Sequence, residues 1–230
     1  MSLLSRRLVD LPVADPPLFQ TMHTMRSMRR LRRDPVPFEL IDVVLDSATR
    51  APNGGNVQPW HFLVIVDPEV RRQMGEIYRG AWDNYFQPTR DAAAGRELDA
   101  PTRRGMAAAE HLGAHFGDAP VQVLVLLRSA IPPEQYPADH AGYYAAIYPA
   151  VQNLLLAARG VGLGATLTTL HRERTPEVRQ LLGIPDDVEI CACVPMGWPE
   201  GRFGPVRRRS LERVAHRDHW DTAWQRTWSP

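Results

Sequence analysis

The residues best suited to chemistry stand in a short polar loop that runs from Ala51 to Trp60. Asn56 and Gln58 each carry an amide that donates and accepts hydrogen bonds at once, which suits the edge of a heterocycle with alternating N–H and C=O groups. Gly54 and Gly55 allow the backbone to approach a ligand closely. A simple turn is the alternative interpretation, because Asn, Gly and Pro are also the residues that turns favour.

Strongly patterned segments flank this loop and must position it. Before the loop, apolar residues recur at helical spacing from Phe38 to Ala48. After it, the run from His61 to Val66 is short, apolar and rich in strand-forming residues. The pattern predicts a loop that joins a helix to a buried strand, and loops held by such a scaffold commonly bind ligands.

Arginines gather in two other segments. The first cluster is Arg26, Arg29, Arg30, Arg32 and Arg33, and the second is Arg207 to Arg209. Either cluster alone is typical of a solvated basic surface or a nucleic-acid patch. A formal net charge of +1 disfavours nucleic acid as the partner, so phosphate is the better candidate ligand. A guanidinium offers phosphate a planar fork of donors, and each such bond contributes about 1.5 to 3 kcal/mol.

Several segments together resemble the FMN-dependent nitroreductase family. They are Arg26 to Arg29, Pro52 to Trp60 with the strand after it, Tyr148 to Arg159, Gly162 to Thr169, and Arg207 to Arg209. The resemblance covers roughly residues 20 to 212 in the family's order and spacing. It implies an α+β fold with a central, mostly antiparallel sheet surrounded by helices, in an intertwined homodimer with FMN at the subunit interface.

The resemblance also implies roles for individual residues. The phosphate and ribityl contacts would be Arg26, Ser27, Arg29, Arg207, Arg208 and Arg209, with no choice made among the last three. The contacts to the polar edge of the flavin would be Pro52, Asn53, Gly54, Asn56 and Gln58. Leu167, Thr168 and Thr169 would approach flavin N5, where a hydroxyl or backbone N–H stabilises the reduced or half-reduced flavin, so Thr168 and Thr169 are the catalytic candidates.

The activity implied is an oxidoreductase that passes hydride from NADH or NADPH through flavin N5 to a small, flat electron acceptor. Nitroaromatics and quinones are the expected acceptors, in a ping-pong reaction. Three alternatives stay open: a reductive dehalogenase, a flavin-fragmenting enzyme and a non-catalytic flavin-binding protein. The flavin would supply the hard chemistry and the protein the orientation and electrostatics.

Composition bounds the remaining possibilities. The length of 230 residues suits one domain or one subunit of an intertwined dimer. No apolar run reaches the roughly 18 residues of a membrane span, and no leader pattern opens the chain, so we expect a cytoplasmic protein without membrane contact. Cys191 and Cys193 alternate in a strand-like run, which predicts that both face the same way as reduced thiols. No metal-ligand spacing is found.

The predicted organisation has three parts, with elements read from apolar periodicity, prolines and caps. They are an arm over 1–16, the FMN-binding domain over 17–212, and an extension over 213–230. We expect helices at 18–28, 37–50, 68 to about 85, 103–116, 140–159 (kinked at Pro149) and 176–182, and strands at 60–66, 121–127, 163–169 and 188–196. Residues 87–105 are interpreted as a mobile lid. Trp220, Trp224 and Trp228 recur at four-residue steps, which predicts one helical face docked on the partner subunit.

Overall fold

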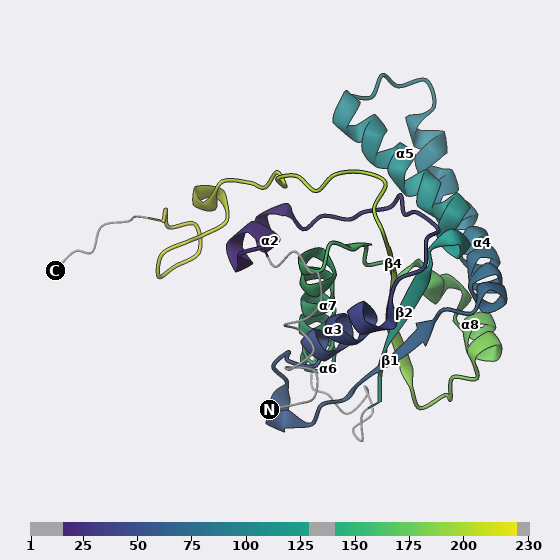
Figure 1. The fold of residues 1–230 in the computed structure, drawn as a ribbon. Coiled ribbons are helices and arrows are strands. Elements are labelled where there is room, and N and C mark those ends of the chain that lie inside the picture. Colours follow the sequence, from purple (N-terminus) through teal and green to yellow (C-terminus); the bar gives the residue numbers. More distant parts are fainter. Residues whose placement is uncertain (1–15, 129–140, 225–230) are drawn as a thin grey trace.

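The computed structural model describes residues 16–128 and 141–224. Its centre is a four-stranded sheet in the order β1-β2-β4-β3, with every neighbouring pair antiparallel. The strands are β1 (Trp60–Ile65), β2 (Val121–Leu127), β3 (Gly164–Ala165) and β4 (Glu189–Gly197), and helices surround them (Figure 1). The predicted α+β class with an antiparallel sheet is confirmed.

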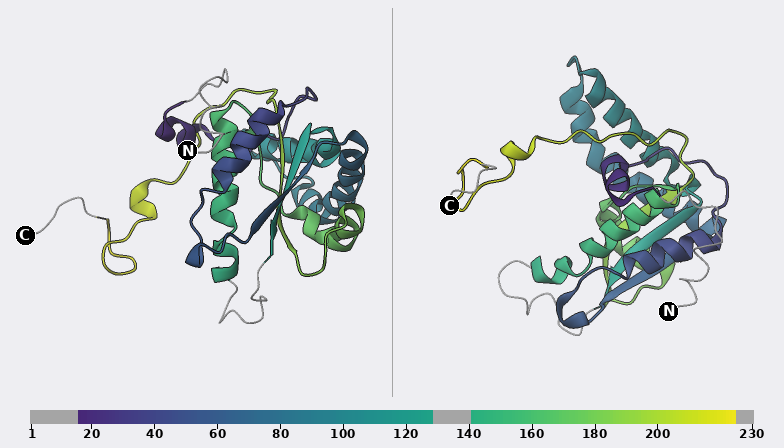
Figure 2. Two further views of the ribbon diagram at one scale, coloured as in Figure 1. Left: turned by 60° about the horizontal axis from the view of Figure 1, so that its bottom comes forward. Right: turned by 60° about the vertical axis from the view of Figure 1, so that its left-hand side comes forward.

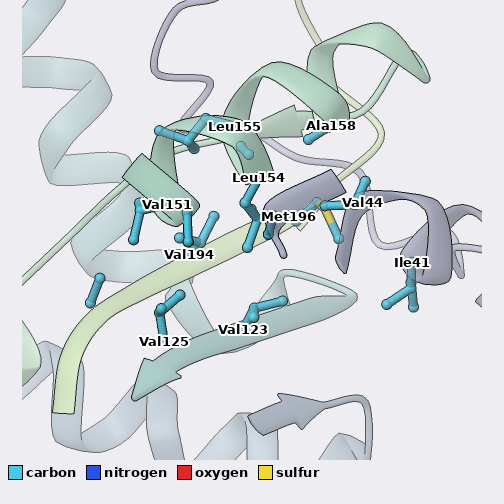
Figure 3. Close-up of a cluster of buried hydrophobic side chains, with 14 of the residues drawn as sticks. Ile41, Val44, Val123, Val125, Val151, Leu154, Leu155, Ala158, Val194 and Met196 are labelled. Atoms are coloured by element: carbon cyan, nitrogen blue, oxygen red, sulfur yellow. The ribbon is translucent and has the colours of Figure 1, made fainter. Parts of the chain in front are cut away.

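Helices cover both faces of the sheet (Figure 2). On one face lie α3 (Phe38–Ala48) and α7 (Tyr148–Gly160), and on the other lie α4 (Pro68–Ala93), α5 (Ala100–His115), the short η2 (Phe116–Asp118) and α8 (Thr175–Leu182). Figure 3 shows the first layer, where Val44 of α3 and Leu154 of α7 pack towards Val123 of β2. Two separate apolar cores therefore hold the sheet between them.

Strand β2 is buried along its whole length, as its unbroken aliphatic sequence predicts. Its side chains alternate between the two cores: Val123 and Val125 enter the α3–α7 layer, whereas Leu124 and Leu126 enter the α4–α5–α8 layer. Only Gln122 is polar, and its Nε2 donates to the carbonyl of Phe116 at 3.0 Å. The predicted strand 121–127 is confirmed.

The two cysteines lie on opposite faces of β4. The register between β2 and β4 shifts at Val125 and Leu126, and this β-bulge breaks the usual alternation. Cys191 consequently packs in the α3–α7 core and Cys193 in the α4–α5–α8 core. The prediction that both thiols face the same way was wrong, because simple alternation assumes an unbulged strand. Both thiols are free and buried, and burial raises the pKa of Cys191 to about 12.

The segment 87–105 is mostly helical. Helix α4 begins where Asp67 accepts hydrogen bonds from the N–H groups of Glu69 and Val70. It then runs on to Ala93, and α5 starts at Ala100 after a second cap by Asp99. Residues 87–93 and 100–105 therefore lie in helices, and the role of 87–105 as a mobile lid stays a prediction. Side-chain hydrogen bonds between α4 and α5, such as the one from Trp82 Nε1 to Glu110 at 3.3 Å, hold the two helices together. Apolar spacing in the sequence does not show such bonds.

Two predicted elements are shorter than expected around the central helix. The helix predicted from 140 to 159 is instead α6 (Ala141–Ala145) followed by α7, and residue 140 lies outside the described residues. Pro149 sits in the first turn of α7, where a missing N–H costs nothing, so it does not kink the helix. Of the strand predicted at 163–169, only β3 forms a regular ladder. Thr166 and Thr168 stay in the same register against β4, where the N–H of Thr166 donates to the carbonyl of Pro195 at 3.4 Å, but Pro195 has no N–H with which to continue the ladder.

The two ends of the described chain also differ from expectation. Helix α2 (Leu18–Thr24) stops four residues early, and the arm over 1–15 lies outside the described residues. Beyond β4 the chain is irregular apart from a short turn, η5 (Leu211–Arg213), and it leads away from the body of the molecule (Figure 1). Trp220 and Trp224 therefore do not share a helical face, which corrects the prediction, and Trp228 lies outside the described residues.

Candidate active site

The first arginine segment is attached to the edge of the sheet. Ser27 forms a parallel bridge with Ala165 of β3, and the N–H of Met28 donates to the carbonyl of Ala165 at 3.0 Å. Gly164 permits this approach, because a Cβ there would lie 2.8 Å from the Cβ of Met28. The pairing places Arg26 and Arg29 beside the start of the threonine segment.

The chain after β4 runs alongside this arginine segment in the opposite direction. The N–H of Arg32 donates to the carbonyl of Trp198, the N–H of Glu200 to the carbonyl of Arg30, and the N–H of Val206 to the carbonyl of His23. Arg207, Arg208 and Arg209 follow directly, all exposed. The structure therefore brings the two predicted arginine clusters together, although they are far apart in sequence.

Ion pairing separates the arginines into two groups. Arg33 pairs with Asp118 at 2.7 Å, Arg32 pairs with Asp34 at 3.4 Å, and Arg30 bonds to His111 at 2.9 Å. The arginines predicted to bind phosphate make no ion pair within 16–128 and 141–224: Arg26, Arg29, Arg207, Arg208 and Arg209. Cations without a protein counter-charge are available to an anionic ligand.

A cavity of about 320 Å³ lies against the threonine segment. Arg29 and Thr166 to Leu170 form one side, and Tyr78 and Trp82 of α4 form the other. Thr166 is almost wholly buried, and its Oγ1 has no hydrogen-bond partner among the described residues. A buried hydroxyl without a partner is costly, so this cavity suits a ligand with polar ring atoms.

A larger cavity, about 560 Å³, lies between α4 and η2 and contains none of the predicted site residues. Its cations are largely engaged by the protein itself. Arg33 bonds to Asp118, Arg71 donates to the carbonyls of Val66 and Ala119, and Arg72 pairs with Glu69 and Glu76. Size alone does not identify a binding site, and the smaller cavity holds the unpartnered groups.

The hydroxyl of Thr168 is held by the protein. Its Oγ1 lies 3.0 Å from the hydroxyl oxygen of Tyr78 and accepts a hydrogen bond from the N–H of Leu170 at 3.3 Å. The backbone of Thr168 also exchanges two 2.9 Å hydrogen bonds with Cys193. Leu167 and Thr169 are exposed beside it. Tyr78 was not predicted as a site residue, because 90 residues separate it from Thr168 and its own helix has no motif.

The predicted flavin-edge loop is a strained turn. Gly55, Asn56 and Gln58 all have positive φ, at 59°, 53° and 53°. The side chain of Asn53 accepts from the N–H of Gln58 at 2.8 Å, and that of Asn56 accepts from Nε2 of Gln58 at 3.2 Å. Pro52, Gly54, Asn56 and Gln58 are exposed. The turn interpretation is thus correct, and strained non-glycine residues are also typical of binding sites.

This loop lies at the opposite corner of the sheet from the arginine segment. Trp60, which ends the loop, pairs with Leu127 at one end of β2. Ala165, the partner of Ser27, pairs with Met196 of β4, and Met196 pairs with Val121 at the other end of β2. The path crosses four strand spacings, about 19 Å, with an offset of about 20 Å along the strands. Within one chain the two sets of predicted contacts are not brought together.

Comparison with known proteins decides the family. The sequence profile described as the Nitroreductase family matches residues 24–198. The chain belongs to the nitroreductase family. The matched segment contains the first arginine cluster, the flavin-edge loop and the threonine segment, and it ends before Arg207.

Individual relatives of this nitroreductase family member carry different names. An NADH dehydrogenase of Thermus thermophilus is 32% identical over 198 residues, covering 82% of this chain and 90% of that protein. Iodotyrosine deiodinase 1 of Rattus norvegicus is 26% identical over 200 residues, covering 85% and 67%. The fold matches that of an FMN- and NADPH-dependent nitroreductase from sphigopyxis sp. strain HMH with a TM-score of 0.66, 20% identity and coverage of 89% and 100%.

Two further features of this nitroreductase family member bear on its chemistry. Within the described ranges no cluster of three or more His, Cys, Asp or Glu side chains is placed to hold a metal ion. No helix in those ranges has both the length and the apolar character that crossing a bilayer requires.

Proposed function

We propose that this chain is an FMN-dependent oxidoreductase that takes hydride from NADH or NADPH and passes it to a small, flat acceptor. One observation carries the proposal: the pairing of Ser27 with Ala165 joins unpaired arginines to a threonine-lined cavity. FMN has one phosphate and one flat ring, so it needs a cationic site beside a polar cavity. The absence of a dinucleotide-binding glycine motif favours FMN over FAD.

The donor set present here fits FMN. Arg26, Ser27 and Arg29 would hold the phosphate and ribityl chain, helped by the exposed triplet Arg207 to Arg209. Thr166 would supply a hydroxyl that has no hydrogen-bond partner in the described parts of the chain. Bound flavin would supply the redox chemistry, and Thr168 and Thr169 would orient its reactive edge.

A second copy of the chain would complete the site. The loop with Pro52, Asn53, Gly54, Asn56 and Gln58 lies far from the arginine segment of its own chain, at the opposite corner of the sheet. By resemblance to the family, its residues would still contact the flavin. We therefore propose a homodimer in which one subunit supplies the loop and the other supplies the arginines and threonines.

A complementation experiment tests the shared site. In a homodimer of Arg29→Ala, both sites lack the arginine, and in a homodimer of Gln58→Ala, both sites lack the glutamine. Each homodimer should therefore bind FMN weakly. In a mixed dimer purified with two different tags, one site combines wild-type Arg29 with wild-type Gln58. Half of the sites should then regain FMN, whereas recovery of none would show that each chain builds its own site.

The reaction itself is tested by spectroscopy. The purified protein should be yellow and should release FMN on heating. Its visible flavin absorbance should disappear when NADH or NADPH is added in the absence of oxygen. Because one cavity faces the threonine segment, the oxidised nicotinamide should leave before the acceptor binds, which gives parallel lines in double-reciprocal plots. Bound flavin that no nicotinamide reduces would instead support a non-catalytic flavin-binding protein.

Reductive dehalogenation is the second candidate, because one group of relatives is named as iodotyrosine deiodinases. The reduced protein should be mixed with a nitroaromatic, a quinone and iodotyrosine in parallel. The acceptor that reoxidises the flavin fastest identifies the reaction class. Release of iodide with no reaction of the other two would replace the nitro- or quinone-reducing proposal.

A further inference from the structure

Tyr78 controls the direction of the Thr168 hydrogen bond. Its side chain is 2% exposed, and its ring stacks on Phe116 with centroids 4.0 Å apart and planes 11° apart. Among the described residues, Thr168 Oγ1 is the hydrogen-bond partner of its hydroxyl, at 3.0 Å. A phenol is more acidic than an aliphatic hydroxyl and is therefore the better hydrogen-bond donor of the two, and a buried proton needs an acceptor. Tyr78 is therefore the donor of this bond.

The lone pairs of Thr168 Oγ1 are then both used. One accepts from Tyr78 and the other accepts from the N–H of Leu170 at 3.3 Å. A threonine hydroxyl has two acceptor lone pairs and one proton. With both lone pairs occupied from the protein side, the proton is the group left for a ligand in the cavity that Thr168 lines.

The phenol keeps its proton at neutral pH. Burial raises the pKa of Tyr78 to about 12, although the bond to Thr168 and the charge of Arg29 act in the opposite direction. Tyr78 is thus a permanent hydrogen-bond donor at neutral pH rather than a general base. Its hydroxyl does not need to touch a ligand to affect one.

We propose that Tyr78 is a positioning residue that fixes Thr168 as a hydrogen-bond donor towards flavin N5. The inference rests on the proposed function and adds a residue to it. In oxidised flavin N5 accepts a hydrogen bond, whereas in reduced flavin it carries a hydrogen and needs an acceptor. The sequence-based expectation that this hydroxyl stabilises reduced flavin requires it to accept from the N–H at N5. A Thr168 hydroxyl held as a donor favours the oxidised form instead, so Tyr78 lowers the reduction potential of the bound flavin.

Tyr78→Phe tests this with the FMN-loaded protein. The substitution removes the donor and frees one lone pair of Thr168 for the N–H of reduced flavin. The affinity for reduced relative to oxidised FMN should rise about tenfold, which raises the midpoint potential of a two-electron couple by about 30 mV. The potential is measured by spectroscopic titration against a reference dye, with FMN affinity as a second readout.

Tyr148→Phe is the matched control. Its hydroxyl also donates to the protein, at 3.4 Å to the carbonyl of Cys191, but Tyr148 packs in the α3–α7 layer on the other face of the sheet. Loss of that hydroxyl should leave the potential unchanged. A potential that moves equally in both variants would reflect general loosening of the protein and would overturn the role of Tyr78.

A double substitution separates positioning from a general structural effect. If Tyr78 acts through Thr168, Tyr78→Phe should not change the potential in a Thr168→Ala background, and Thr168→Ser should respond to it as the parent does. Equal potentials in parent and Tyr78→Phe, both loaded with FMN, overturn the positioning role and leave the proposed function intact. Failure of the parent to bind FMN contradicts the proposed function, and the positioning role falls with it.

Discussion

At the scale of residues, the useful distinction is between arginines with and without a protein partner. Arg29 and Arg33 lie four residues apart in one segment, yet only Arg33 is paired, with Asp118 at 2.7 Å. Arg29 is half-buried and lines the cavity beside Thr168. The two residues form a natural comparison, because each is an arginine in the same local sequence and they differ in what they face.

Arg29→Ala should weaken FMN binding about ten- to a hundredfold, because one charge-assisted phosphate contact contributes about 1.5 to 3 kcal/mol. Titration of the apoprotein with FMN, followed by flavin fluorescence, measures the effect. Arg33→Ala should bind FMN like the parent, and its exposed ion pair contributes about 1 kcal/mol or less to stability. Equal loss in both variants would show that the cluster is merely a basic surface.

His171 should make stability depend on pH. It is fully buried, and neither ring nitrogen has a well-formed hydrogen bond to a residue that the structure describes. Burial lowers its pKa from 6.5 to about 4, with the backbone of Ile190 opposing part of that shift. Between these values the unfolded chain binds more protons than the folded one. Stability is therefore complete above about pH 6.5 and falls as the pH drops towards 4, by about 3 kcal/mol in total.

The measurement is urea unfolding between pH 4.5 and 7. His171→Leu should have a flatter pH dependence than the parent, since the titrating group is gone. His219→Leu, at an exposed position outside the core, should keep the slope of the parent. A parent and a His171→Leu variant with the same slope would mean that other groups cause the acid sensitivity.

At the scale of elements, two glycines of α5 have opposite effects: one permits close packing against α4, and the other has no neighbour and only weakens its own helix. A Cβ on Gly113 would lie 2.6 Å from ring atoms of Trp82 on α4, whereas a Cβ on Gly105 would meet no atom within 4 Å. Gly113 therefore permits α4 and α5 to pack closely, and Gly105 is only a weak point in its helix.

Gly113→Ala should destabilise the protein by about 1 to 3 kcal/mol, because the ring of Trp82 must move out of a packed layer. Gly105→Ala should stabilise it by about 1 kcal/mol, since alanine has the higher helix propensity and has room. Urea unfolding midpoints of the two variants would move in opposite directions. A stabilised Gly113→Ala protein would contradict the packing of α4 on α5.

The sequence predicted elements well where one local signal dominates. The buried strand 121–127 follows from seven residues with only one polar member, and the start of α4 follows from the Asp67 cap. It failed where tertiary contacts decide. The regular ladder of the strand at 163–169 is short because Pro195, which lies opposite Thr166 on β4, has no N–H to donate, and the bulge in β4 has no glycine to mark it. Tyr78 escaped notice because the fold alone places it beside Thr168.

At the scale of the molecule, exposed apolar groups lie on the segments at both ends of the described chain. Phe19 of α2 is 74% exposed, and Trp220 in the segment after η5 is 81% exposed. Leu18 and Met22 of α2 are exposed as well, and a group of large apolar side chains on one short element is typical of an interface. With the proposal that two chains share the flavin site, they favour a dimer in which these segments reach a second copy.

Light scattering at low micromolar concentration should therefore give twice the chain mass of 25.9 kDa. Replacing Phe19 and Trp220 together by serine should weaken the dimer and, with it, FMN binding, because the loop and the arginines would separate. Gln180→Ser, at an exposed position of α8 away from these segments, serves as the control. A monomer that holds FMN tightly would contradict the shared site.

The bulge in β4 gives the molecule two built-in reporters. Cys191 and Cys193 are the two cysteines of the chain, and each is buried in a different core. An alkylating reagent reaches a buried thiol only when the layer over it opens. The rate at which Cys193 is modified would report how often α4, α5 and α8 separate from the sheet. The rate for Cys191 would report the same for α3 and α7. Mass spectrometry of the two peptides could thus time the opening of each half of the protein separately, without any added label.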